Sequence, residues 1–595
     1  MQREFLSAKR RELTLLVGTF AGLSLLLYLP DLLLNGFAES GSHTPLSAET
    51  LARALFSWDV FVLFGCYSLL PAALSEDGPL DRVGAGCVVL LVLYAVYEAA
   101  VGTMLHRPPN FYADRPHLVG AFYLALNGAV PMLHMVGLCT AVGMAGLAAW
   151  TLPALLSRIH RILASRPARP LVIGLHVITW GGLLGGAALF GSDEGALPNS
   201  GGPPAEVQAP GFPARSPAAG LLQNVRRSIA LQRRIADRWR QPADSTYVRY
   251  LRRPIERRVP VYIIVLESYG SVLAASPETR SRYRRLMAET TDSLEAGGWE
   301  FVTGRSEAPV FGGLSWLSVS SLLTGTPVAH QPVLEALRPE LSRYPHLPRV
   351  LEEAGYATAT VQAPVRKRPG LSVENPYGFD RTFYLEELDY RGPQFGWGIV
   401  PDQYSLAVAH ELFVERQKEP FFLLFETVSS HAPWAERPPP FVASATRASA
   451  YRGSSTTDRD PAFKPRSSIE SRHLAHIRYQ WRVLERYIRE KAPPESLFLV
   501  VGDHQPHFAR RGGRSTPVHL IARNGHLVRR LEPYHFQTGG LPPQIPTRLT
   551  HAGLYSLLME AILTPSSAPD SSRGASEVHT RGVERAALLP ARGKR

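Results

Sequence analysis

Cysteine is scarce in this chain and is confined to its N-terminal part. The only three are Cys66, Cys87 and Cys139. Small secreted domains that lack a large hydrophobic core depend on dense disulfide bonds. The long region after residue 139 therefore has no disulfide framework, whichever compartment it occupies.

Charged residues are also few, at 19% of the chain, and basic residues outnumber acidic ones. The formal net charge of +13 could suggest nucleic acid. Arginines that flank apolar stretches and fill the tails explain it more simply, so we expect no nucleic-acid partner. A length of 595 residues excludes one small domain, because a single hydrophobic core rarely grows beyond about 250–300 residues.

Long apolar runs are abundant up to residue 191. A helix needs about 20 apolar residues to cross a bilayer. The first run is too long, and is followed by too many others, to be a cleaved signal peptide. Residues 1–191 are therefore predicted to form an all-α transmembrane bundle of five helices, at 13–34, 52–74, 85–105, 128–152 and 171–191.

Basic residues at the ends of these runs predict the orientation. Lys9, Arg10 and Arg11 precede the first run, and four arginines between 158 and 169 lie between the fourth and fifth. Positively charged flanks face the cytoplasm. With five crossings, the chain after residue 191 should lie on the extracytoplasmic side of a cytoplasmic (inner) membrane, which makes this a multi-pass membrane protein.

Three ionisable residues, Asp59, Glu98 and His134, fall inside or near the apolar runs. Such groups suggest function, because burying them unpaired in a membrane is costly. Alternatively, Asp59 sits near a span end and Glu98 meets a polar neighbour in the bundle. We favour this second interpretation, since the repeats and broken helices typical of transporters are not visible. The bundle is then an anchor that could also hold a lipid.

Composition divides the rest of the chain into three parts. Residues 192–258 combine a linker rich in Gly, Pro, Ala and Ser with a basic helical stretch that could lie at a membrane surface. Residues 259–564 have the pattern of a globular domain. Residues 565–595 are rich in Ser, Pro and Arg without periodicity, which predicts a disordered tail.

Three apolar runs in the globular part, at 259–267, 421–425 and 497–501, have the pattern of buried strands. Continuous β-branched runs are typical of parallel strands covered on both faces. Helical patterns lie between them, so we expect an α/β domain with a mostly parallel central sheet. Ligands bind beyond the carboxyl ends of such strands. Four candidate side chains follow them there: Glu267, His431, Asp503 and His504.

Each of these residues taken alone could be a helix cap or a structural hydrogen-bonding group. Together, two carboxylates and an imidazole can hold a divalent cation such as Mn²⁺ or Zn²⁺ and leave positions open for chemistry. Ser315 follows Gly312 and Gly313 and begins a helical pattern. It is either a helix cap or a nucleophile, which a base or a metal ion would have to activate.

The pattern resembles the sulfatase/alkaline-phosphatase superfamily over residues 259–560, and the whole layout resembles the lipoteichoic acid synthase-type membrane phosphoglycerol transferases. The matching segments are Val265-Leu266-Glu267-Ser268, Gly313-Leu314-Ser315, 347–356, Tyr377-Gly378-Phe379-Asp380, 397–402, Ser430-His431-Ala432-Pro433 and Gly502-Asp503-His504.

The resemblance implies that Glu267, Ser315, Asp503 and His504 coordinate one divalent metal, Mn²⁺ first, with Zn²⁺ or Mg²⁺ as alternatives. It makes Ser315 the nucleophile that carries a covalent phospho-intermediate. His431 would contact the substrate phosphate or assist the leaving group. Ser315 stands where the family usually has Thr. The family's substrate-binding His, Trp and Arg have no clear match in this sequence. We therefore name Arg366, Arg368 and His519 as candidate substrate-binding residues. The arginines could equally form a solvated turn, and His519 could serve a second metal site.

The resemblance thus predicts a membrane-anchored phosphotransferase that moves a phosphoglycerol-type head group from a phospholipid donor to an envelope glycan or lipid. Sulfate-ester hydrolysis is not expected, because Ser315 lacks the C/S-x-P-x-R context of formylglycine formation. The missing cysteines argue against the disulfide-rich phosphoethanolamine transferases. Two alternatives stay open: a phosphodiesterase or other hydrolase that uses water as acceptor, and a non-catalytic membrane scaffold.

Overall fold

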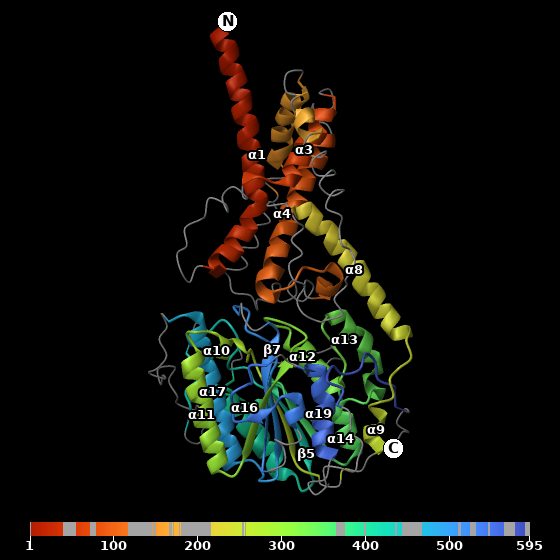
Figure 1. Ribbon diagram of the computed structural model, residues 1–595, viewed down its shortest axis with the longest axis vertical. Helices are drawn as coiled ribbons and strands as arrows, with labels where there is room; N and C mark the ends of the chain where they lie inside the picture. Colours follow the sequence, from red (N-terminus) through yellow and green to blue (C-terminus); the bar gives the residue numbers. More distant parts are fainter. Residues whose placement is uncertain are drawn as a thin grey trace. The chain divides into compact units, whose positions relative to one another are not determined.

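The computed structural model is shown in Figure 1. It describes residues 2–39, 55–71, 79–116, 146, 150–165, 169–170, 172–177, 179, 216–252, 255, 258–363, 375–397, 400–434, 437–442, 467–509, 513–523, 531–545, 548–563 and 578–589. The chain divides into two compact units, Met1–Gln232 and Arg233–Arg595. Each unit is described by itself.

The first unit is helical. It contains α1 (Gln2–Glu39), α3 (Trp58–Leu69) and α4 (Pro79–Leu105), and residues 150–163 are also helical. These helices share an apolar core that includes Leu27, Phe64, Val88 and Leu156. Burial of one apolar stripe on each helix is what holds such a bundle together.

Two helices in the described part of the chain are long and apolar enough to cross a membrane, at Lys9–Pro30 and Pro79–Leu105. They coincide with the first and third predicted spans. Within the described residues of the second span, 55–71, the structure has the shorter apolar helix α3, of 12 residues. Most of 128–152 and 171–191 lies outside the described residues. The five-helix bundle therefore stays a prediction.

Two of the three ionisable residues that the sequence places inside or near the apolar runs, Asp59 and Glu98, lie among the described residues. Asp59 accepts hydrogen bonds from the Ser216 hydroxyl (2.6 Å) and the Ala218 amide (3.3 Å). It thereby caps the start of α8 (Pro217–Arg240). Glu98 lies against Gly220 of the same helix, where a Cβ would meet its Oε1 at 2.9 Å. His134 lies outside the described residues.

A nine-stranded sheet forms the centre of the second unit, in the order β4-β3-β5-β1-β6-β7-β2-β8, with β9 paired to β2. The strands are β1 (Val261–Leu266), β2 (Glu300–Glu307), β3 (Ala357–Val361), β4 (Arg381–Phe383), β5 (Phe421–Glu426), β6 (Leu497–Gly502), β7 (Ser515–Ala522), β8 (Gln537–Thr538) and β9 (Leu549–Thr550). All six residues of β1 and all six of β6 are buried, which explains their continuous apolar sequence.

The prediction of a mostly parallel sheet was wrong, because the sheet is mixed. The strands from β4 to β6 are parallel, but β7 pairs antiparallel with both β6 and β2, and β8 pairs antiparallel with β2. A parallel neighbour needs a crossover, usually a helix. The described residues between β6 and β7 contain no helix, so β7 returns in the opposite direction.

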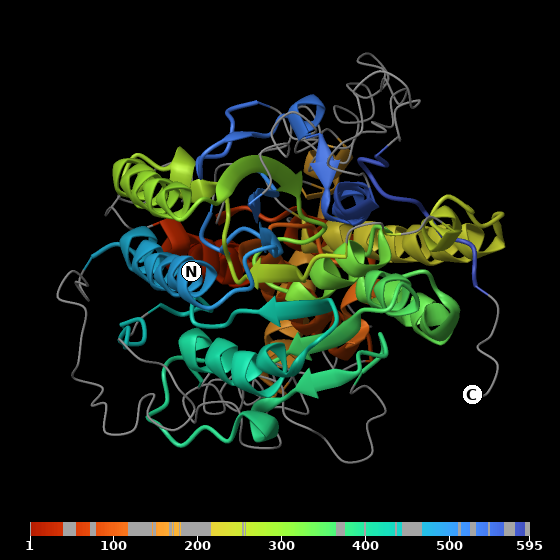
Figure 2. The same ribbon diagram turned by 90° about the horizontal axis from the view of Figure 1, so that it is seen from below.

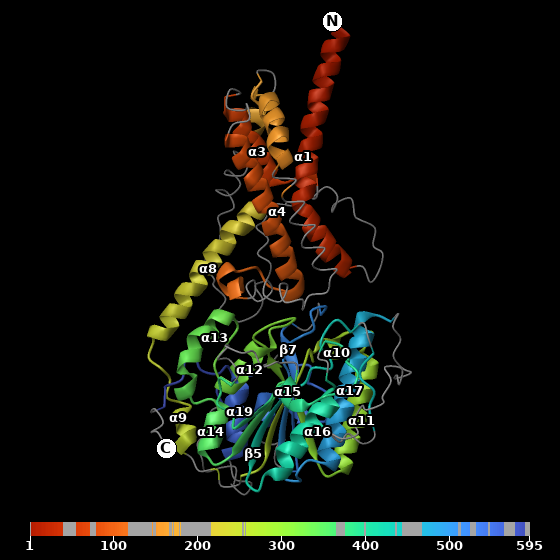
Figure 3. The ribbon, with the colours of Figure 1, turned by 180° about the vertical axis from the view of Figure 1, so that it is seen from behind.

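Helices cover both faces of this sheet, as Figures 1 and 3 show. On one face, α11 (Arg280–Ala296), α16 (Asp402–Leu412) and α17 (Ile469–Glu490) share a core with Tyr262, Ile264 and Leu266 of β1. The other face carries α12 (Ser315–Thr324), α13 (Gln331–Leu337), α14 (Leu347–Glu353) and α19 (His551–Leu563). Figure 2 shows the same layers from below. Shorter elements are α9 (Val248–Arg252), α10 (Val272–Ala275), α15 (Leu385–Leu388) and the 3₁₀ turns Arg338–Arg343, Val414–Arg416 and Glu532–Tyr534.

The described part of the predicted disordered tail, residues 578–589, is ordered against the second unit. The Val583 amide donates to the Gly325 carbonyl (2.9 Å) and the Ala587 amide donates to the Asp244 carbonyl (2.7 Å). The side chains of Val583, Ala586 and Leu589 are buried. These buried apolar side chains supply the apolar burial that a disordered segment lacks. The prediction of a disordered tail was therefore wrong for residues 578–589.

Candidate active site

Glu267 is the first residue after β1, so it stands at the carboxyl end of the central strand. Its backbone amide donates to the Thr427 hydroxyl (3.1 Å), and its Oε1 accepts from the Ser268 hydroxyl (2.8 Å). Ser268 has a φ of +56°, in the left-handed region that non-glycine residues seldom occupy. The backbone therefore turns sharply at Ser268, and the Ser268 hydroxyl holds the Glu267 carboxylate.

Ser315 is the first residue of α12 and follows a tight turn. Gly312, Gly313 and Leu314 have φ values of +71°, +156° and +67°. The Ser315 Oγ lies 3.1 Å from Glu267 Oε2 and 3.2 Å from His504 Nε2. Leu314, not Ser315, occupies the cap position of the helix. The hydroxyl therefore faces the acid and the imidazole rather than capping the helix, which excludes the helix-cap interpretation.

Asp503 and His504 follow β6 directly. Asp503 Oδ1 accepts from the backbone amides of Ser268 and His504, at 2.7 Å each. Its Oδ2 is buried without a hydrogen-bond partner. His504 Nδ1 lies 2.9 Å from the Gln505 carbonyl, to which it donates, so Nε2 is left as the nitrogen without a proton. That Nε2 is 3.3 Å from Asp503 Oδ2 and 3.7 Å from Glu267 Oε1.

The two carboxylates differ in their acidity. Burial acts to raise the pKa of Glu267, but His504, His431 and the bond from Ser268 outweigh it and lower that pKa. Burial and the adjacent Glu267 charge raise the pKa of Asp503 well above its usual value. Burial also lowers the pKa of His504. Two buried acids that repel each other are a place where a cation is favourable.

The donor set fits a divalent metal ion. Glu267, Asp503 and His504 each offer one ligand atom, and these atoms lie within 4.8 Å of one another. The unpartnered Asp503 Oδ2 is one oxygen that such an ion would satisfy. Carboxylate oxygen, imidazole nitrogen and a hydroxyl together suit Mn²⁺ or Zn²⁺.

His431 lies in the loop after β5, at the same edge of the sheet. Its Nδ1 is 2.8 Å from the Ala432 carbonyl, and its ring stacks on Trp397 with centroids 4.1 Å apart and an interplanar angle of 16°. Its charge acts on the pKa values of Glu267 and His504, so it belongs to their surroundings. Arg366 and Arg368 lie outside the described residues.

His519 is not placed to bind a substrate, which corrects that prediction. It sits in the middle of β7, where it is fully buried, and burial lowers its pKa to about 3. Its Nε2 lies 3.0 Å from the Tyr269 hydroxyl and its Nδ1 lies 2.8 Å from the Thr303 hydroxyl. A single histidine in an apolar strand can be a buried, hydrogen-bonded side chain as readily as a residue that binds a metal ion or a substrate. His507, also near the site in sequence, stacks on Trp434.

Several residues that support the site were not singled out by their chemistry in the sequence. Asp402, at the start of α16, accepts from the amides of Val428 (2.7 Å) and Ser429 (3.1 Å) and so holds the loop that carries His431. His473 is buried on α17, with its Nε2 3.0 Å from the Ser268 carbonyl. A possible signal was the spacing of His473, His476 and Gln480, which places three polar side chains on one face of a helix.

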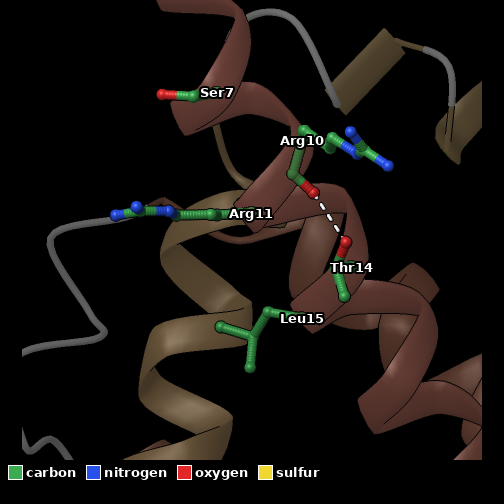
Figure 4. Close-up of a pocket in the computed structure, with 5 residues that line it drawn as sticks. All are labelled: Ser7, Arg10, Arg11, Thr14 and Leu15. Atoms are coloured by element: carbon green, nitrogen blue, oxygen red, sulfur yellow. Dashed lines mark hydrogen bonds between the residues drawn. The ribbon is translucent and has the colours of Figure 1, made fainter. Parts of the chain in front are cut away.

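Figure 4 shows a separate hollow, on α1, lined by Ser7, Arg10, Arg11, Thr14 and Leu15. The Thr14 hydroxyl donates to the Arg10 carbonyl (2.8 Å). The two arginine side chains point in opposite directions (Figure 4). These residues include no acid or imidazole, so the hollow lacks the groups of the candidate active site.

The sequence was compared with known protein families and the structure with solved structures. No curated protein matches the sequence. The family model described as Sulfatase matches residues 264–531.

Three solved structures illustrate the likeness. The lipoteichoic acid synthase LtaP from Listeria monocytogenes is 14% identical, with 60% of this chain and 82% of that chain covered and a TM-score of 0.34. The lipooligosaccharide phosphoethanolamine transferase EptA from Neisseria meningitidis is 12% identical, with 92% and 95% covered and a TM-score of 0.45. The phosphoglycerol transferase GacH from Streptococcus pyogenes is 13% identical, with 57% and 89% covered and a TM-score of 0.32.

The family match begins within β1, ends after β7 and includes all four clustered residues, Glu267, Ser315, Asp503 and His504. Residues 264–531 of the chain therefore form a sulfatase-family domain.

Proposed function

We propose that this protein is a membrane-anchored, metal-dependent phosphotransferase. It would move a phospholipid head group of the phosphoglycerol type, through a covalent phospho-Ser315 intermediate, to an acceptor outside the cytoplasm. One observation carries the proposal: the Ser315 Oγ lies 3.1 Å from a carboxylate oxygen and 3.2 Å from an imidazole nitrogen. A serine hydroxyl needs such neighbours before it can act as a nucleophile.

The residues after Ser315 support phosphoryl transfer over sulfate-ester hydrolysis. Trp316, Leu317, Ser318 and Val319 supply neither the proline nor the arginine of the C/S-x-P-x-R context. Ser315 therefore keeps its hydroxyl. An unmodified hydroxyl can attack phosphorus and form a phosphoserine.

In the first step, Ser315 Oγ attacks the phosphorus of the donor lipid and its proton passes to Glu267. The bond between phosphorus and the diacylglycerol oxygen breaks, and His431 gives that oxygen a proton. In the second step, an acceptor hydroxyl gives its proton to His431 and attacks phospho-Ser315. Ser315 Oγ then leaves and recovers its proton from Glu267.

Glu267, Ser315, Asp503 and His504 would hold the divalent ion. When bound, it supplies Lewis-acid chemistry that lowers the pKa of the serine hydroxyl and neutralises charge on the phosphoryl group. Ser315 is also the first residue of α12, and a helix N-terminus favours phosphate oxygens. Phosphoryl transfer relies mainly on positioning and charge neutralisation, which these parts supply.

The apolar helices Lys9–Pro30 and Pro79–Leu105 support the membrane location. Lys9, Arg10 and Arg11 at the start of the first one favour a cytoplasmic N-terminus. We propose a multi-pass protein of the cytoplasmic membrane with its sulfatase-family domain on the outer side. There a phospholipid donor is concentrated in the bilayer.

The test uses purified full-length protein, Mn²⁺ and phosphatidylglycerol labelled in its head group. We expect a mass adduct on the peptide that contains Ser315, and the adduct mass identifies the transferred group. Ser315→Ala should give no adduct and no turnover. Ser293→Ala, which removes a hydroxyl from α11 away from the site, is the control and should behave as the wild type.

The fate of the label separates the two enzyme classes. Label on a glycan or lipid acceptor supports a transferase, whereas free glycerol phosphate as the sole product supports a hydrolase. Near-normal turnover by Ser315→Ala would refute the proposed mechanism.

A further inference from the structure

Trp397 is 56% exposed, yet one face of its ring lies on His431. The ring centroids are 4.1 Å apart and the planes differ by 16°. Another exposed tryptophan of this unit, Trp316, is held differently, because its Nε1 donates to Gln331 (2.8 Å). The indole of Trp397 is thus placed by its contact with a histidine of the candidate active site.

The backbone under His431 is held firmly by other groups. Asp402 accepts from the Val428 and Ser429 amides, and the Ser430 hydroxyl donates to the Glu267 carbonyl (2.5 Å). These bonds fix the loop but do not fix the plane of the imidazole. Trp397 lies five residues before Asp402, so the segments that carry the two rings are joined through this carboxylate.

The imidazole itself makes two contacts within the described part of the chain. Nδ1 lies 2.8 Å from the Ala432 carbonyl, and the ring face lies on Trp397. A bond to the neighbouring carbonyl leaves Nε2 as the nitrogen that is free to exchange a proton. The bond at Nδ1 holds one edge of the ring, and the stack holds its plane; without the stack the ring could tilt about that bond and Nε2 would move.

We propose that Trp397 is a positioning residue that holds the His431 imidazole in the orientation needed for proton transfer to the leaving oxygen. This inference rests on the proposed function, in which His431 gives that proton. An indole face also attracts a cation, so the stack persists when the imidazole carries its extra proton. Stacking of this kind is known to stabilise aromatic pairs beyond the area that they bury.

The experiment measures kcat and KM for the labelled phospholipid donor with full-length protein and Mn²⁺. His431→Ala should lower kcat about 100-fold, which is typical of losing a general acid. Trp397→Ala should lower kcat about tenfold with KM nearly unchanged, since misplacing a reacting group costs rate. Trp397→Phe keeps an aromatic face and should restore most of the rate. Ile545→Ala, which trims another exposed apolar side chain, should match the wild type.

The double variant Trp397→Ala/His431→Ala decides whether the two residues act together. If Trp397 acts through His431, the double variant should be no slower than His431→Ala alone. Additive losses, or an effect of Trp397→Ala on KM alone, would overturn the inference and show that the indole contacts the substrate directly. Melting temperatures equal to the wild type would show that no variant is merely misfolded.

Failure of this inference can be told apart from failure of the proposed function. A slow His431→Ala variant beside a normal Trp397→Ala variant overturns the inference alone. Normal activity of His431→Ala overturns both the histidine's role and the inference. The Ser315 adduct tests the covalent mechanism independently of both.

Discussion

The pKa values of Glu267 and Asp503 shift in opposite directions, although both carboxyl groups are buried beside the His504 imidazole. Glu267 accepts a hydroxyl bond and lies near two histidines, and its pKa falls. Asp503 keeps one buried oxygen without a partner and faces the charge of Glu267, and its pKa rises. The asymmetry makes Glu267 the proton acceptor from Ser315 in our mechanism. It also explains why the pair would hold a cation.

A third acid gives a prediction at this scale. Glu426 ends β5, in register with Val265, and burial together with the Glu267 charge raises its pKa from 4.5 to about 7. The folded protein therefore prefers the protonated acid. This stabilisation is complete below the unfolded pKa and is lost as the pH rises through about 7. Glu426→Gln stays neutral, so its free energy of unfolding should fall less between about pH 5 and about pH 8.

The measurement is denaturant unfolding of metal-free protein across that pH range, with wild type and Glu426→Gln side by side. Glu353→Gln, on α14 outside the site, is a matched control and should follow the wild type. Equal pH dependence in all three proteins would show that Glu426 does not titrate in this window.

At the scale of elements, the turn before α12 determines where the nucleophile points. Leu314 has a φ of +67° and occupies the cap position, so Ser315 begins the helix with its hydroxyl toward Glu267. A left-handed conformation costs about 1–2 kcal/mol for a residue with a side chain. Such strain is retained where the surrounding structure enforces it, often at functional sites.

Substitution at Leu314 should separate strain from function. Leu314→Gly relieves the strain, so it should keep activity and change stability by less than about 1 kcal/mol. Leu314→Val places a β-branched side chain in the left-handed region and should cost about 1–3 kcal/mol. Its kcat should also fall, because Ser315 shifts with the turn. Melting temperature and turnover measure the two effects, and a fully active Leu314→Val protein would contradict this account.

For the whole molecule, the C-terminal segment 578–589 connects distant parts of the second unit. Arg585 pairs with Glu340 (2.7 Å) and donates to the Trp239 carbonyl (2.9 Å). The Ala586 amide donates to the Tyr344 hydroxyl (3.0 Å). The segment thus ties the last turn of α8 to the 3₁₀ turn Arg338–Arg343, and the Val583 amide ties it to Gly325 at the end of α12.

Removing residues 578–595 should therefore destabilise the second unit. Loss of the buried Val583 and Leu589 side chains alone should cost on the order of 3 kcal/mol. A thermal melt of full-length protein in detergent measures the change, and deletion of 590–595 alone is the control. Activity at low temperature should survive, since the segment holds none of the four clustered residues. An unchanged melting temperature would show that these contacts contribute little.

The sequence by itself determined the local features of this protein. The apolar runs predicted β1, β5 and β6, because strands buried on both faces must be apolar throughout. The polar residues after those runs predicted Glu267, Asp503 and His504 as neighbours, because parallel strands end at one edge of a sheet. Their order and spacing also carried the family resemblance, which the match over 264–531 confirms.

Only the tertiary structure decided what depends on distant contacts. β7 pairs with β2, more than 200 residues earlier, and His519 is buried in the middle of that strand. The order in residues 578–589 comes from partners on other elements, which composition does not report. The stack of Trp397 on His431 brings together two loops that are separated in the sequence, and Asp402 holds the loop that carries His431. Such contacts form because packing between remote segments lowers the free energy of the folded chain. No local pattern in the sequence encodes them.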